Sequence, residues 1–136
     1  SDYYRLLDQV RYEGDWEAWL DFFLEGVRVT AEGAVATARR LDGVFAHDRR
    51  RILSLGRRAS SALRVHEAMK SRPLQSVQNL VERSGLSAPT VNAALRQLSG
   101  PALAITREVT GRQRDRVFAY DQYLAILTEG TEAQPG

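Results

Sequence analysis

Two short amphipathic helices joined by a tight turn, in residues 76–98 (SVQNLVERSGLSAPTVNAALRQL), constrain the fold more than any other feature of the chain. Ser76 is placed to cap the first helix, whose inward positions are Val77, Leu80 and Val81. Gly85 supplies the permissive backbone that the turn needs, and Leu86 fills the angle between the two helices. The segment therefore predicts a helix-turn-helix.

The second helix of this pair has separate inward and outward faces. Ser87 is a good N-cap, and Pro89 falls in the first turn, where a missing N–H costs little. Helical spacing turns Val91, Leu95 and Leu98 inward and leaves an outward face of Thr90, Asn92, Ala93, Arg96 and Gln97. In a helix-turn-helix this face enters the major groove. Its candidate DNA contacts are Thr90, Asn92, Arg96 and Gln97.

Two short strands are predicted after the helix pair, at residues 104–109 (AITREV) and 116–120 (RVFAY). The connection between them is rich in arginine, a residue that offers phosphate oxygens a charged fork of donors. The pattern predicts the β-wing of a winged helix-turn-helix, with candidate DNA contacts at Arg112, Arg114 and Arg116. The alternative is that these side chains are merely solvated.

The N-terminal part of the chain reads as helical and unusually aromatic. Residues 3–12 predict a short helix ended by Gly14, and Asp15 caps a longer helix with an apolar stripe. At Gly43 that helix either ends or runs on, and periodicity does not decide between the two. The stripe needs a partner surface, and we expect homodimerisation or domain packing through Trp16, Trp19, Leu20, Phe23 and Val27.

Composition and charge exclude several classes of protein. The chain has 136 residues and no cysteine, so disulfide frameworks and thiolate metal sites are excluded, and we expect no cofactor. No apolar run reaches membrane-spanning length, which makes the cytoplasm the expected location. Residues 1–50 carry seven basic and ten acidic side chains, whereas residues 51–136 carry twelve and seven. The basic half contains the helix-turn-helix, as binding to DNA requires.

The order of these segments resembles the C-terminal region of bacterial Fic-family proteins, over about residues 2–128. The resemblance rests on YYRLLDQVRYEGDWEAWLDFFLEGV, on an Ala-rich helix with an Arg-studded stretch, and on the REVTGRQRDRVFAY wing. Its most specific residues are Gly14, Asp15, Trp16, Trp19, Phe22 and Phe23. The resemblance implies that the first helices close a Fic-type bundle and that a winged helix follows.

Fic domains usually transfer AMP from ATP to a hydroxyl of a target protein, but their active-site motif, His-x-Phe-x-x-Gly-x-Gly-Arg, does not occur in this sequence. The resemblance implies a catalytic domain upstream of Ser1, and we expect this chain not to be an enzyme. His47 and His66 lie in other contexts. The carboxylates Asp21, Glu25 and Glu32 share part of a helical face, which is more typical of solvated side chains than of a metal site.

We therefore expect a mainly α fold with three parts: a helical segment over residues 1–57, whose first helices are those of the bundle; a winged helix-turn-helix over 58–128, whose first helix covers 60–70 and ends at Arg72-Pro73; and a disordered tail over 129–136. The expected function is binding of double-stranded DNA by a transcriptional regulator. The alternative is a protein-interaction or regulatory module that positions an upstream Fic domain.

Overall fold

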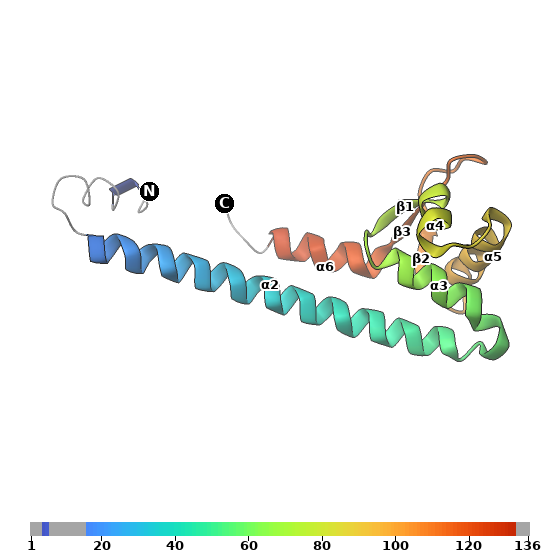
Figure 1. The fold of residues 1–136 in the computed structure, drawn as a ribbon, viewed down its shortest axis with the longest axis horizontal. Coiled ribbons are helices and arrows are strands. Elements are labelled where there is room, and N and C mark those ends of the chain that lie inside the picture. Colours follow the sequence, from blue (N-terminus) through green and yellow to red (C-terminus); the bar gives the residue numbers. More distant parts are fainter. Residues whose placement is uncertain (1–3, 6–15, 133–136) are drawn as a thin grey trace. The chain divides into compact units, whose positions relative to one another are not determined.

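The computed structural model describes residues 4–5 and 16–132, and its fold is mainly helical with a small antiparallel sheet (Figure 1). The helices are α2 (Trp16–Leu53), the 3-10 helix η1 (Gly56–Arg58), α3 (Ala59–Met69), α4 (Val77–Ser84), α5 (Ala88–Ser99) and α6 (Asp121–Glu132). The strands are β1 (Leu74–Ser76), β2 (Thr106–Glu108) and β3 (Val117–Tyr120).

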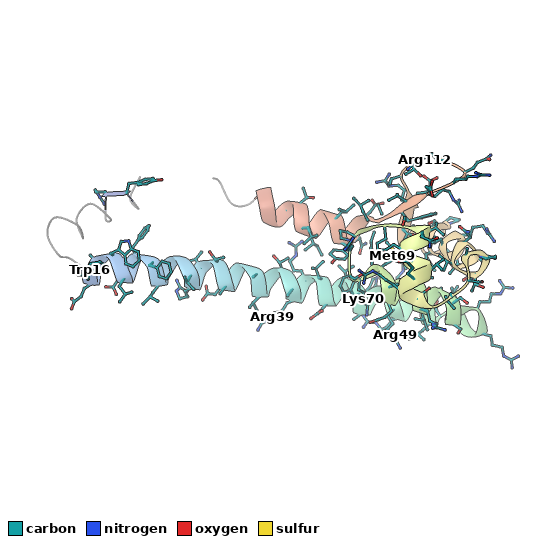
Figure 2. The ribbon with its side chains drawn as sticks, turned by 45° about the horizontal axis from the view of Figure 1, so that its top comes forward. Trp16, Arg39, Arg49, Met69, Lys70 and Arg112 are labelled. Carbon is teal, nitrogen blue, oxygen red and sulfur yellow. The ribbon has the colours of Figure 1, made fainter. Side chains whose placement is uncertain are left out.

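The chain divides into two compact units, and the first comprises Ser1–Ala38. Its described part consists mainly of the first turns of α2, which begin at Trp16 (Figure 2). In this chain alone the aromatic stripe is largely exposed, since Trp16 is 65% exposed and Phe23 48% exposed, so the predicted partner surface is not supplied by the described residues. Apart from the helical Tyr4 and Arg5, the helix predicted over residues 3–12 lies outside the described residues.

The second unit comprises Arg39–Gly136 and contains the hydrophobic core. α2 runs unbroken past Gly43 to Leu53, which settles the alternatives left open by periodicity. The unit begins earlier than the predicted boundary at residue 58 because the end of α2 belongs to the core, where Ile52 is fully buried. Other fully buried core residues are Ala62, Val65, Met69, Leu80, Val91, Leu98 and Tyr120.

The capping residues around the α4–α5 turn behave as the sequence predicts. The Ser76 hydroxyl accepts a hydrogen bond from the Asn79 backbone N–H at 3.1 Å, and the Ser87 hydroxyl accepts one from Thr90 at 3.4 Å. Gly85 ends α4 in the left-handed region with φ +72°, where a side chain would be strained. These local interactions fix where both helices begin and where the first one ends.

The sheet has three strands, whereas the sequence predicted two. Its order is β1-β3-β2, with both pairings antiparallel, and β1 aligns Leu74 with Ala119 while β2 aligns Thr106 with Tyr120. β2 and β3 are also shorter than the predicted strands. Buried Gln75 in β1 donates to the Ala68 carbonyl oxygen at 2.8 Å, which satisfies an acceptor near the end of α3.

Helix α6 corrects the predicted tail, because residues 129–132 are helical and not disordered. α6 is tied to the rest of its unit at several points. Tyr123 donates to the Lys70 carbonyl oxygen at 3.0 Å, Asp121 forms two 3.1 Å bonds with Arg107, and Glu129 pairs with Arg40 of α2 at 2.6 Å. Residues 133–136 of the predicted tail lie outside the described residues.

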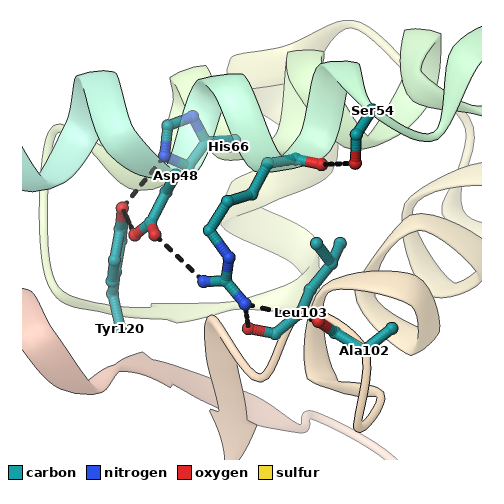
Figure 3. A network of polar contacts seen from close by, with 7 residues as sticks. Asp48, Ser54, His66, Ala102, Leu103 and Tyr120 are labelled. Carbon is teal, nitrogen blue, oxygen red and sulfur yellow. Dashed lines mark hydrogen bonds and ion pairs between the residues drawn. The ribbon is translucent and has the colours of Figure 1, made fainter.

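A buried polar network joins α2, α3 and β3 (Figure 3). The Tyr120 hydroxyl donates to Asp48 Oδ2 at 2.6 Å and lies 3.0 Å from His66 Nε2. Because the single phenolic hydrogen points to Asp48, His66 Nε2 carries the hydrogen of the second bond. Arg51 completes the network, since it lies 3.3 Å from Asp48 Oδ1 and donates to the Leu103 carbonyl oxygen at 2.5 Å.

Candidate nucleic-acid interface

Helix α5 presents a polar face opposite its buried side. Val91, Leu95 and Leu98 are buried, as helical spacing predicts, together with Ala94. Arg96 is exposed in the middle of the opposite face, whereas Thr90, Asn92 and Gln97 are half-buried. The Thr90 hydroxyl shares a 2.9 Å hydrogen bond with the Ser87 hydroxyl at the start of the helix. Arg96 is therefore the most accessible of the four predicted contacts.

A shallow groove of about 540 Å³ runs along one edge of this face. Two predicted residues, Thr90 and Gln97, line it. Two residues that the sequence analysis missed line it as well, Arg57 and Arg58 of η1. Ser60, Ser61, Pro89, Ala93 and Ala94 complete its walls. The sequence does show two adjacent arginines directly before a helix, and this pair could have been noticed as a candidate contact. Its position beside α5, however, depends on the packing of α3 against α5.

The loop between β2 and β3 is held in shape by Glu108. Its carboxylate accepts hydrogen bonds from the backbone N–H groups of Thr110 and Gly111, at 2.5 and 2.6 Å, and from the Thr110 hydroxyl at 3.2 Å. These donors, the Gly111 N–H first, hold the pKa of Glu108 below its usual value. Gly111 and Asp115 adopt positive φ angles of 65° and 53°, which glycine and aspartate tolerate better than most residues.

Arg116 links the base of this loop to α5. Its Nη2 donates to Asn92 Oδ1 at 2.5 Å, and its guanidinium carbon lies 5.6 Å from the centre of the Phe118 ring. Both partners of the hydrogen bond were predicted as DNA contacts. In the structure the two side chains are bonded to each other, which fixes the loop beside the edge of α5 that carries Asn92.

The other two predicted arginines lie on the exposed part of the same loop. Arg112 lies on this loop (Figure 2), and its Nη2 donates to the Asp115 carbonyl oxygen at 3.3 Å. Arg114 is exposed. Together with Arg116 they place three guanidinium groups between β2 and β3. Asp115 is the acidic residue among them, so the loop is basic overall.

The predicted packing residues belong to the first unit. Trp16, Leu20, Phe23 and Val27 are exposed, and Trp19 is half-buried and stacks on Phe23 with ring centres 5.5 Å apart. The neighbouring carboxylates Glu25 and Glu32 bond Arg28, as expected for a solvated face. Among the residues that the structure describes, no group of three or more acidic or histidine side chains is arranged to hold a metal ion.

Comparison of the chain with protein-family models gave no match. The resemblance to Fic-family proteins therefore stays a prediction. Within residues 4–5 and 16–132, no helix combines the length and the apolar character that crossing a membrane requires.

Proposed function

We propose that the second unit is a winged helix-turn-helix that binds double-stranded DNA, with α5 in the major groove and the β2–β3 loop on the sugar-phosphate backbone. The arrangement of arginines around α5 carries this proposal. Helical spacing puts Asn92, bonded to Arg116, at one edge of the exposed face, and it puts Thr90 and Gln97, beside Arg57 and Arg58, at the other. Arg96 lies between these edges.

Positive charge on both sides of an exposed helix suits a duplex, whose phosphates border the major groove on both sides. Arg96 is long enough to reach a guanine edge or a phosphate, and Arg112 and Arg114 are free of carboxylate partners among the described residues. The exposed alanines Ala88 and Ala93 offer base edges little beyond contact with a thymine methyl. We therefore propose that most of the affinity comes from phosphates and that base readout is sparse.

Fluorescence anisotropy with random-sequence duplex DNA tests the proposal. We expect saturable binding, and we expect the logarithm of its association constant to fall linearly with the logarithm of the salt concentration. An R96A/R112A/R114A variant should shift that slope toward zero by about two to three and abolish measurable binding at physiological salt. An R49A/R50A variant removes two positive charges from exposed positions of α2 and should bind like the original chain. Absence of binding at low salt would overturn the proposal in favour of a protein-interaction module.

The groove beside α5 gives an independent prediction. Replacement of Arg57 and Arg58 by alanine should weaken binding roughly tenfold or more, and by similar factors for unrelated duplex sequences, because phosphates carry no sequence information. The same anisotropy titration, run on two duplexes of different sequence, measures both effects. Unchanged affinity would show that this edge of α5 faces away from DNA. A loss confined to one duplex would instead indicate base contact.

A further inference from the structure

The first unit presents an apolar stripe that the described residues leave uncovered. We call it the α2 stripe; its members are Trp16, Leu20, Phe23, Val27, Ala31, Ala34 and Ala38. All seven are exposed, with Leu20 at 49% and Val27 at 51%. Most helical stability in proteins comes from packing of such a face, so a stripe of this size requires an occupant.

The spacing of the α2 stripe is symmetric about Val27. From Val27 toward the N-terminus the members follow at steps of four, three and four residues, and toward the C-terminus the steps are again four, three and four. Two copies of the stripe laid antiparallel with Val27 opposite Val27 therefore keep every member in register with another member. A two-fold axis of this kind is the commonest symmetry of soluble homo-oligomers.

The sizes of the side chains favour the antiparallel arrangement over the parallel one. All members before Val27 are bulky, and all members after it are alanine. Antiparallel pairing puts Phe23 against the partner's Ala31, and it likewise pairs Trp16 with the partner's Ala38. Parallel pairing would put bulky residues opposite their own copies and alanines opposite alanines, which leaves overcrowding at one end and voids at the other.

The surface of α2 already has the matching shape. A hollow of about 520 Å³ lies directly C-terminal to the projecting rings of Phe22 and Phe23, with small residues on its floor. Its lining is Phe22, Phe23, Gly26, Val27, Thr30, Ala31 and Ala34. Projection and hollow are neighbours on one helix, so a two-fold axis between them lets each copy fill the hollow of the other.

Charge along the helix favours the same orientation. Residues 16–32 carry four carboxylates against one basic residue, Arg28, and the exposed Arg39 follows the last alanine of the α2 stripe. In an antiparallel pair the acidic end of one copy lies beside the basic end of the other. In a parallel pair Glu17, Asp21 and Glu25 would lie beside their own copies, which is unfavourable.

We propose that the α2 stripe is covered by a second copy of this chain, antiparallel, with the two-fold axis at Val27. The pairing does not depend on the DNA-binding proposal, and either can fail while the other stands.

Disulfide cross-linking tests the orientation, because the chain has no cysteine of its own. Leu20→Cys and Ala34→Cys variants, one of them tagged, are oxidised separately and as a mixture. The proposed pairing puts residue 20 opposite the partner's residue 34, whereas two copies of residue 20 lie about 21 Å apart along the axis, far beyond disulfide reach. We expect the mixture to form at least about ten times more covalent dimer than either variant alone. Efficient cross-linking of Leu20→Cys with itself would overturn the proposal in favour of parallel pairing.

Sedimentation velocity of the full chain tests the pairing itself, with a mass of twice 15.2 kDa expected at micromolar concentration. Phe23→Glu should raise the dissociation constant at least about a hundredfold, because the charge would be buried against an apolar hollow. Val29→Glu, a matched change on the opposite side of α2, should leave it unchanged. The double variant F23A/A31F exchanges the large and the small side chain of the proposed 23–31 pair. It should therefore dimerise as the original chain does. A monomeric original chain, its stripe covered by residues 1–15 or by nothing, would overturn the proposal.

Discussion

Replacing Tyr120 by phenylalanine is expected to lower the free energy of unfolding by about 2 to 4 kcal/mol, although it removes a single oxygen atom. Tyr120 and Asp48 are 0% and 1% exposed, and the hydroxyl donates to the carboxylate at 2.6 Å. Without it, Asp48 keeps Arg51 at 3.3 Å but loses its shortest hydrogen bond in a site that water does not reach. His66 Nε2 loses its acceptor at the same time.

Tyr123 provides the matched control. Its hydroxyl also accounts for one hydrogen bond, 3.0 Å from the Lys70 carbonyl oxygen, but the acceptor is neutral and the side chain is half-buried. Tyr123→Phe should therefore cost about 1 kcal/mol. Urea denaturation followed by circular dichroism at the helical band measures the loss of stability in both variants. This probe is preferable to tryptophan fluorescence because Trp16 and Trp19 lie in the first unit. Equal losses in the two variants would show that the Asp48 carboxylate does not depend on Tyr120.

Elements that depend on residues close together in the chain could be predicted from the sequence. The ends of α4 and the start of α5 are set by hydroxyls three residues from the N–H groups that they cap, at Ser76 and Ser87, and by the left-handed Gly85. The buried side of α5 follows from helical spacing for the same reason.

Elements that depend on distant partners were missed. β1 has three residues with no strong strand pattern, and its structure comes from pairing with β3 far along the chain. Asp48 stands beside the exposed His47 in the sequence and was not predicted to be buried, because its partner Tyr120 lies 72 residues away. α6 was assigned partly to the tail because its anchors, Arg40 and Lys70, lie in other elements.

The candidate interface also contains parts that could be predicted from local sequence and parts that could not. Its basic loop and the polar face of α5 were predicted because each is a local pattern, and the structure finds Arg96 and Arg114 exposed. The hydrogen bond between Asn92 and Arg116 could not be predicted, since it joins two elements. The same holds for Arg57 and Arg58, which reach α5 through the packing of α3. Sequence patterns indicated the type of site, and tertiary packing determined its outline.

His66 makes the stability of the second unit depend on pH. Burial in the network, and to a lesser degree the charge of Lys70, lowers the pKa of His66 to about 4 from a value of 6.5. Because the folded protein holds this imidazole neutral, the unfolded chain takes up a proton first as the solution is acidified. The stabilising contribution is fully present above about pH 6.5 and is lost progressively down to about pH 4.

The shift corresponds to a loss of about 3 kcal/mol of stability between pH 7 and pH 4, added to whatever the carboxylates contribute. His66→Gln isolates it, because the amide can still donate to the Tyr120 oxygen but does not titrate. We expect the variant to be less stable at pH 7 and to show a shallower loss on acidification, measured by urea denaturation at a series of pH values. His47→Gln, at an exposed position of α2, should keep the original slope. If His66→Gln and the original chain lose stability in parallel, the imidazole is not held neutral by the fold.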